Sequence, residues 1–296
     1  MSNTICLTGH TGYIGSHFLQ FLIRRGHSPF LIGRKGIQTK SVPGCKEAKL
    51  WNSISDLKIQ LFDLENPIII NIAGLFASDH KLANYSQLID ANFSYSLSIM
   101  EAISDLPRAR IVNIGSSWEY NDFGKSAPQN LYAQLKACNS SVAQWYAINH
   151  DIRTINLKLN DTFGGNDHRA KLMPLLKNHY LSGTTAQLRF SAQLINLLHI
   201  SDVCEGLLSA ANRTSTLPPN TCETAFLYAK DTLKLSELVN LINTLSSSVL
   251  RVKFHTEYPS EHRLRGVWNE APLLQGWQPK LELIHSLEDY FIGAEK

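Results

Sequence analysis

The feature of this sequence that most constrains its fold is an alternation between short apolar runs and longer amphipathic stretches in its first half. Buried strands are predicted at the apolar runs, which span residues 4–8, 29–33, 67–72, 110–114 and 154–159. Helices are predicted at residues 12–25, 85–104 and 131–149. Strands that are apolar throughout and alternate with helices form a parallel sheet covered on both faces. We therefore predict an α/β fold with a doubly wound parallel sheet, whose ligands bind at the carboxyl ends of the strands.

The pattern becomes less regular after Leu159. It predicts a helix that ends near Tyr180, a closing helix from Leu283, and further elements at residues 193–198, 202–212, 224–229, 236–245 and 250–255. We expect a Rossmann domain of residues 1–163, to which residues 194–230 return. A smaller, interleaved carboxyl-terminal lobe of residues 164–193 and 231–296 would then bind the substrate.

Composition narrows the function class. Hydrophobic residues make up 44% of the 296-residue chain and charged residues 18%, which is typical of a folded protein with a large core. A net charge of +3 without a Lys/Arg cluster does not indicate a nucleic-acid partner, and no apolar run is long enough for a membrane span. The amino terminus does not resemble a signal peptide, and the five scattered cysteines are expected to be reduced thiols in the cytoplasm. No histidine or cysteine ladder predicts a metal site.

A glycine-rich loop follows the first predicted strand. Gly9, Gly12 and Gly15 stand between that strand and the first predicted helix. In this context Gly9 permits a tight turn, Gly12 leaves room for a pyrophosphate, and Gly15 allows close packing of helix and sheet. The N–H groups of the first helical turn and the helix dipole would hold the anion. The loop predicts a dinucleotide site.

The end of the second predicted strand bears on which dinucleotide binds. NAD-binding folds usually place an acidic residue about 20 residues after the glycine loop, where it bonds the ribose 2′-hydroxyl. Here that strand ends in Gly33, Arg34 and Lys35, and the two cations suit a 2′-phosphate. We therefore predict NADPH rather than NADH as cofactor. The alternative is a solvated basic turn without a ligand.

Tyr132 and Lys136 lie on one face of a predicted helix, one turn apart. A phenol with a pKa of about 10 is a poor acid or base at neutral pH. A neighbouring ammonium favours the phenolate, and we expect it to lower this pKa toward a useful range. Ser116 and Ser117 follow a predicted strand, so one of their hydroxyls can bind a carbonyl oxygen at the same edge of the sheet.

These motifs resemble the extended short-chain dehydrogenase/reductase family, which contains nucleotide-sugar epimerases, 4,6-dehydratases and 4-ketoreductases. The resemblance also covers Asn92 and the segments 71–74, 157–167, 199–203 and 277–280, so it runs through the whole chain. Within the family, the segment 115–118, the segment 161–164 and Trp277 are most similar to the CDP-abequose/CDP-paratose synthase group.

The resemblance implies roles for individual residues. Tyr132 would be the acid, Lys136 would tune it, and Ser117 would orient the substrate carbonyl, although counting back from Tyr120 selects Ser116 instead. The expected cofactor-binding set is Gly9, Thr11, Gly12, Tyr13, Ile14, Gly15, Arg34, Lys35, Ala73, Gly74, Leu75, Asn92, Tyr132, Lys136, Leu159 and Thr162. The expected substrate-binding set is Ser116, Trp118, Asp161, His168, Arg169, Lys171 and Arg265. For the basic members of that set, an exposed surface position is an equally weighted alternative, and Trp118 could instead fill the interface between the lobes.

One departure from the family pattern selects among its reactions. The dehydratases carry an Asp-Glu pair after the catalytic hydroxyl residue, whereas this chain has Trp118 and Glu119. Since elimination needs both carboxyl functions, dehydration is disfavoured. We expect an oxidoreductase that uses NADPH to reduce the 4-keto group of a nucleotide-linked deoxysugar, of the CDP-4-keto-3,6-dideoxyhexose type. The alternatives are a 4-epimerase that retains its NAD(P) and a non-catalytic NADP-binding sensor or scaffold. The helices at residues 85–104 and 131–149 would form a homodimer seam.

Overall fold

The computed structural model describes residues 3–34, 42–64, 66–77, 84–246, 248–255 and 267–293. Across these ranges the main sheet has seven strands in the order β11-β6-β5-β4-β1-β2-β3, and every neighbouring pair is parallel. The strands are β1 (Thr4–Thr8), β2 (Phe30–Arg34), β3 (Lys46–Trp51), β4 (Pro67–Asn71), β5 (Arg110–Ser116), β6 (Arg153–Leu159) and β11 (Cys222–Leu227). The predicted doubly wound α/β fold is confirmed.

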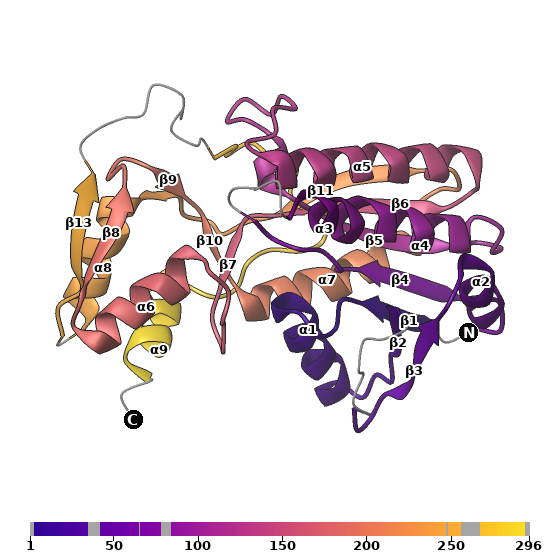
Figure 1. Cartoon of the computed structure of the whole chain (residues 1–296), viewed down its shortest axis with the longest axis horizontal. Helices are drawn as coiled ribbons and strands as arrows, with labels where there is room; N and C mark the ends of the chain where they lie inside the picture. The colour runs from indigo at the N-terminus through magenta and orange to yellow at the C-terminus, as the bar shows by residue number, and fades with distance from the viewer. Residues whose placement is uncertain are drawn as a thin grey trace.

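Helices cover both faces of this sheet (Figure 1). One face carries α1 (Tyr13–Arg24) and α7 (Ile200–Thr214), and we call it the apolar face. The other face carries α2 (Ile54–Phe62), α4 (Tyr95–Ile103) and α5 (Leu131–Asn149), and we call it the polar face. A short helix, α3 (Tyr85–Ile89), and a π-helical turn, η1 (Asp90–Ser94), lead into α4.

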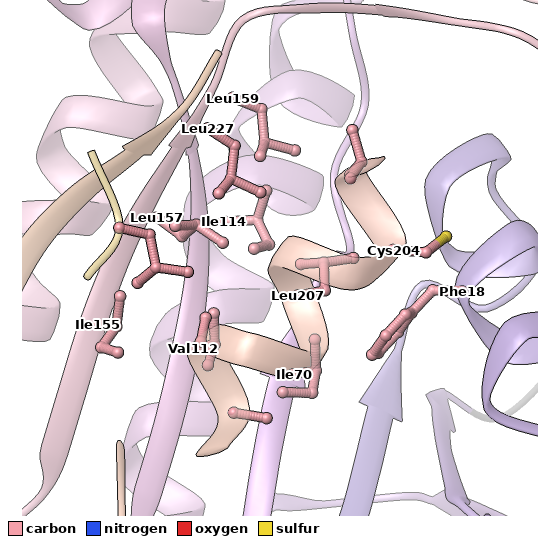
Figure 2. Packing of buried hydrophobic residues seen from close by; sticks show 14 of the residues in the cluster. Phe18, Ile70, Val112, Ile114, Ile155, Leu157, Leu159, Cys204, Leu207 and Leu227 are labelled. Atoms are coloured by element: carbon pink, nitrogen blue, oxygen red, sulfur yellow. The ribbon is translucent and has the colours of Figure 1, made fainter. Parts of the chain in front are cut away.

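The apolar face is hydrophobic over the middle of the central strands. Alternate side chains of each strand point to the same side of a sheet. On this side Ile70, Val112, Ile114, Ile155 and Leu157 pack toward α1 and α7, from which Phe18 and Leu207 complete the cluster (Figure 2). Burying each such side chain stabilises the fold by roughly 1.5–3 kcal/mol.

The polar face becomes hydrophilic toward the carboxyl ends of the same strands. Asn71, Asn113 and Asn156 are in register on β4, β5 and β6, and all three are buried. Asn71 Nδ2 donates to Asn113 Oδ1 at 3.2 Å, and Asn113 Nδ2 donates to Asn156 Oδ1 at 3.0 Å. Asn139 of α5 joins this row through a 3.3 Å bond from its Nδ2 to Asn113 Oδ1. Side-chain hydrogen bonds therefore fix α5 on the sheet.

The carboxyl-terminal lobe has a core of its own, at the left of Figure 1. Its helices are α6 (Leu172–Ser182), α8 (Leu235–Leu245) and α9 (Leu283–Phe291). Its strand pairs are β8 (Thr185–Arg189) with β13 (Arg251–His255), β9 (Leu194–Ile195) with β12 (Leu233–Lys234), and β7 (Asp161–Phe163) with β10 (Leu197–His199). Leu198 packs into the core of the main sheet, whereas the neighbouring Leu197 packs into the lobe. The segment between the two cores therefore contributes to both.

Several elements differ from those predicted. The helix expected at residues 85–104 is interrupted by the π-helical turn at Asn92, whose amide bonds neighbouring main-chain groups. The strand expected at residues 193–198 divides at Asn196, whose side chain bonds the main chain of Ala229 in both directions. The strands β3, β7 and β8 were not predicted, because their sequences lack a continuous apolar run, and the short helix α2 was not predicted either.

In the described ranges, no helix combines the length and the apolar character needed to cross a membrane. Over the same residues, no group of three or more His, Cys, Asp and Glu side chains could hold a metal ion.

Candidate active site

A cavity of about 530 Å³ opens at the carboxyl ends of β1, β4, β5 and β6, between the sheet and the carboxyl-terminal lobe. This is the edge at which doubly wound sheets bind ligands. Most of the predicted site residues line it: Gly9, Thr11, Gly12, Tyr13, Ile14, Gly15, Ala73, Gly74, Leu75, Ser116, Trp118, Tyr132, Lys136, Leu159, Asp161, Thr162, Arg169 and Lys171.

The glycine loop forms one wall of the cavity. Gly9 has a φ of +68°, and a Cβ there would lie 2.7 Å from the backbone nitrogen of Ala73, so both conformation and space require glycine. Helix α1 starts directly after Gly12, and no side chain caps its N-terminus. Its first-turn N–H groups therefore suit an anionic group such as a pyrophosphate.

His10 lies in the same loop and was not predicted as a site residue. Its side chain is 7% exposed, and neither ring nitrogen has a hydrogen-bond partner among the described residues. Burial lowers the pKa of His10, so the ring is neutral at neutral pH. Buried polar groups in proteins are normally hydrogen-bonded. A polar ligand bound at the N-terminus of α1 could provide the partner that the His10 ring lacks.

Tyr132 and Lys136 are on α5 and line the cavity. Asn130 caps this helix, since its side-chain oxygen accepts a 2.9 Å hydrogen bond from the backbone nitrogen of Ala133. Lys136 Nζ donates to the carbonyl oxygen of Ile114 at 3.1 Å. Burial lowers the pKa of Lys136 to about 8, Glu119 opposes this shift and Lys158 adds to it.

The pKa of Tyr132 shifts in the direction opposite to the one expected from its spacing to Lys136. Burial raises the pKa of this phenol, the charges of Glu119 and Asp161 raise it further, and Arg169 opposes them. The phenol is thus protonated across the neutral range in the free protein. Sequence spacing places the ammonium on the correct helix face, but it does not reveal how deeply the phenol is buried.

The two candidate serines are placed differently. Ser116 lines the cavity, and its hydroxyl oxygen accepts a 3.2 Å hydrogen bond from the backbone nitrogen of Trp118. Ser117 starts the single-turn helix η2 (Ser117–Glu119) and is not among the residues that line the cavity. The expectation of Ser117 assumed that the strand ends at Ile114. In the structure β5 continues to Ser116, and the geometry favours Ser116 as the residue that binds the carbonyl.

An aromatic wall stands beside Tyr132, and one of its members was missed by sequence reasoning. The ring of Phe76 meets the rings of Tyr132 and Trp118 edge-on, at centroid distances of 5.4 Å and 5.5 Å. The ammonium of Lys171 lies 4.3 Å from the centroid of Phe76 and 3.6 Å from the carboxylate of Asp161. Phe76 follows β4 closely, so its place at the carboxyl edge of the sheet could have been predicted.

Arg169 joins the lobe to the glycine loop. Its guanidinium donates to both carboxylate oxygens of Asp167, at 2.8 Å and 2.7 Å, and to the carbonyl oxygen of Thr162 at 3.0 Å. It also stacks 3.7 Å from the ring centroid of Tyr13, whose hydroxyl donates to Gly164 O at 2.8 Å. These contacts already engage Arg169 within the protein, and its expected bond to a substrate stays a prediction.

The remaining predicted residues lie elsewhere. Asn92 bonds both main-chain groups of Leu75, at 3.1 Å and 2.9 Å, and so fixes a cavity wall without lining it. His168 is exposed and does not line the cavity. Arg34 ends β2, next to Gly33 on the cavity wall, whereas Lys35 and Arg265 lie outside the described residues.

Comparison with known proteins identifies the class. Residues 5–222 match the model of the NAD dependent epimerase/dehydratase family, and the chain belongs to this family. It is 30% identical over 249 residues to CDP-abequose synthase of Yersinia pseudotuberculosis, covering 83% of this chain and 86% of that protein. It is 23% identical over 299 residues to CDP-abequose synthase of Salmonella typhimurium, covering 96% of each.

The fold also matches a solved structure of UDP-glucose-4-epimerase from Stenotrophomonas maltophila with bound NAD and formylated UDP-arabinopyranose. The TM-score is 0.82 at 15% identity, and the match covers 98% of this chain and 97% of that one. The family and its relatives support an oxidoreductase-type enzyme that modifies sugar nucleotides.

Proposed function

We propose that the protein is an NADPH-dependent reductase of the 4-keto group of a nucleotide-linked deoxysugar, of the CDP-4-keto-3,6-dideoxyhexose type. The observation that carries the proposal is one cavity in which the glycine loop faces Ser116, Tyr132 and Lys136. The likeness to two CDP-abequose synthases supports the class of substrate.

The proposed roles follow from the contacts. NADPH, when bound along the glycine loop, would supply a hydride to C4 of the sugar. The Ser116 hydroxyl, whose oxygen already accepts a bond from Trp118, donates its proton to the substrate carbonyl and orients it. Tyr132, held protonated by burial, gives its proton to the oxygen as negative charge develops there. Lys136 then stabilises the phenolate, and the ketone has gained one hydride and one proton.

Two contacts argue against dehydration in this cavity. With Ser116 as the catalytic hydroxyl residue, Ser117 and Trp118 fill the two positions where the dehydratases carry Asp and Glu, and the Trp118 ring packs edge-on against Phe76 at 5.5 Å. Glu119, the next carboxylate along the chain, is 2% exposed and forms a buried ion pair with Lys158. It does not line the cavity, so it is not available as a base for the sugar.

The test is to incubate the purified protein with NADPH and a panel of CDP-, dTDP- and GDP-linked 4-keto-deoxysugars, following the loss of NADPH absorbance. A reductase consumes one NADPH for each sugar reduced. A 4-epimerase that retains its cofactor and a non-catalytic sensor both show no net NADPH consumption with these ketones, so such a result contradicts the proposal. Ser116→Ala should lower kcat roughly 10²–10³-fold, whereas Ser117→Ala, the matched control, should lower it less than about tenfold.

We also propose NADPH rather than NADH as the cofactor, with Arg34 and Lys35 as ligands of the 2′-phosphate. The support is that Gly33 lines the cavity and that cations, not a carboxylate, follow it. Arg34→Ala should weaken NADPH binding roughly tenfold while leaving NADH binding unchanged, as measured by fluorescence titration. Equal loss for both dinucleotides would contradict this assignment.

Finally, we propose a cytoplasmic homodimer that associates through α4 and α5. The support is the exposure of Leu97 on α4 and of Trp145 and Ile148 on α5, the last two being 54% exposed each. Light scattering should give twice the mass of the chain, and Trp145→Glu should shift it to a monomer. A monomer in the wild type would contradict the dimer without affecting the reductase.

A further inference from the structure

A buried ion pair lies just outside the cavity, under the strand that ends in Ser116. Lys158 of β6 is 0% exposed and Glu119 of η2 is 2% exposed, and Lys158 Nζ contacts Glu119 Oε2. A Cβ on Gly115 would lie 2.8 Å from Lys158 Nζ, so glycine is required for the pair to fit beneath the strand. Neither charged residue lines the cavity.

The pair joins the elements that carry the proposed catalytic groups. Glu119 Oε1 accepts a 2.7 Å hydrogen bond from the backbone nitrogen of Ser116. Ser140 of α5 accepts a 2.5 Å bond from Lys158 Nζ, and its hydroxyl lies 3.2 Å from Glu119 Oε2. The same hydroxyl lies 2.9 Å from the carbonyl oxygen of Lys136, one turn earlier on α5. A chain of contacts therefore runs from the Ser116 backbone to the helical turn that holds Lys136.

Stability alone does not explain such a pair. Taking two charges out of water is expensive, and a well-packed apolar pair of similar volume is often as stable or more stable. The pair adds directional hydrogen bonds that an apolar pair could not make, since Glu119 accepts from the backbone nitrogen of Ser116 and Lys158 donates to Ser140. It also balances two opposite fields at Lys136, since Glu119 raises and Lys158 lowers the pKa of that ammonium.

We propose that Glu119 and Lys158 are positioning residues, which hold the backbone of Ser116 and the Lys136 turn of α5 in a single frame through Ser140. The inference rests on the proposed reductase function. It gives Glu119 a role other than that of an acid or base on the sugar. It also assigns a reason for Lys158 to be a buried cation in a strand whose neighbours Leu157 and Leu159 are apolar.

The test compares Glu119→Gln, Lys158→Met and the double variant, with Glu223→Gln as a matched control. Glu223 forms a 2.9 Å ion pair with Arg213 between β11 and α7, away from the cavity. Each single variant at the buried pair should lower kcat roughly 10- to 100-fold without changing NADPH affinity. The control should stay within about twofold of the wild type.

A second readout does not depend on turnover. The Lys136 side chain is titrated by NMR in protein labelled with ¹³Cε-lysine, assigned with Lys136→Arg. The charged groups acting on it from the packed elements are Glu119 and Lys158. Its titration should move to lower pH in Glu119→Gln, to higher pH in Lys158→Met, and back toward the wild type in the double variant.

Two outcomes would overturn the inference. One is an unchanged Lys136 titration in both single variants. The other is full activity in Lys158→Met with none in Glu119→Gln at any pH, since that marks Glu119 as a catalytic base. If the charge variants do not fold, Ser140→Ala carries the test: kcat should fall about tenfold at unchanged NADPH affinity, and an unchanged kcat overturns the inference. A wild type that reduces no sugar nucleotide refutes the reductase, whereas the NMR titration still reports on the pair.

Discussion

The two faces of the central sheet are built from the same strands but differ in chemistry. On the apolar face, Val112 and Ile114 of β5 lie in one hydrophobic cluster with residues of α1 and α7 (Figure 2). On the polar face, the side chain of Asn113 of the same strand is hydrogen-bonded to Asn71, Asn139 and Asn156. Both faces are equally buried, so burial alone does not account for the difference.

The difference is explained by what each helix has to do. Apolar packing is non-directional, and it tolerates small shifts of a helix along a sheet. Helix α5 carries Tyr132 and Lys136, and a displacement of about 1 Å at a reacting group can cost about 10²-fold in rate. Directional hydrogen bonds between α5 and the sheet fix that position. We infer that the apolar clusters of both faces supply stability and that the asparagine row of the polar face also supplies register.

The largest expected effect on the polar face is that of Tyr132→Phe. Removing the phenol hydroxyl removes the proton donor but leaves a ring of the same shape, so kcat should fall roughly 10²- to 10⁴-fold. NADPH affinity, measured by fluorescence titration, and the Tm should stay close to the wild type. The matched control is Tyr146→Phe on the same helix, whose hydroxyl donates to Glu101 Oε2 at 2.7 Å away from the cavity. Retained turnover in Tyr132→Phe would remove the proposed acid.

The largest expected effect on the apolar face is one of stability. Leu207 of α7 is fully buried in the cluster of Figure 2, and Leu207→Ala should lower the free energy of unfolding by about 2–5 kcal/mol. Urea denaturation measures this loss, and kcat per folded molecule should be unchanged. Leu181→Ala, at a side chain that is 55% exposed, is the control and should change stability little. A large fall in kcat for Leu207→Ala would contradict the inference that this cluster contributes to stability and not to the position of the catalytic groups.

Neighbouring residues of β5 offer the sharpest comparison. Asn113→Ala removes one bond from Asn71 and leaves the buried Nδ2 of Asn139 and Oδ1 of Asn156 without the bonds that Asn113 provides, at a cost of about 1–3 kcal/mol for an unsatisfied group. Val112→Ala should cost about 2 kcal/mol through lost apolar burial. Although both variants are destabilised, only Asn113→Ala should also lose about tenfold in kcat, because α5 is released from its register. Equal kcat values in the two variants would contradict the proposed role of the asparagine row.

The same contrast explains how much could be predicted from the sequence. The strands of the main sheet that were predicted are continuous apolar runs. The predicted bounds of helix α5 agree with the observed ones, because its helical pattern is long and Asn130 is a typical residue to precede a helix. The glycine loop, Tyr132 and Lys136 were placed at the cavity because strand order fixes which ends meet. These inferences depend on local patterns and on one rule of topology.

What was missed depends on contacts between distant segments. The sequence does not show that Glu119 faces Lys158, that Arg169 stacks on Tyr13, or that Phe76 stands between Trp118 and Tyr132. The choice between Ser117 and Ser116 has a related difficulty, since it depends on where β5 ends, and the structure extends that strand to Ser116. The raised pKa of Tyr132 follows from burial, which spacing along a helix cannot report.

The smallest expected effect is a pH dependence, and it tests the polar face without disturbing its packing. Burial lowers the pKa of Lys136 to about 8 in the free protein, and the proposed role needs the ammonium. The kcat/KM for NADPH, which reports groups of the free enzyme, should therefore fall about tenfold per pH unit above that value. The sign follows because raising the pH removes the proton and hence the charge that stabilises the phenolate. Lys136→Arg keeps its charge throughout, so its lower activity should show no such alkaline limb. If Lys136→Arg shows the same alkaline fall in kcat/KM, the titrating group is not Lys136. The opposing effects of Glu119 and Lys158 on the pKa of Lys136 would then have no part in this pH dependence.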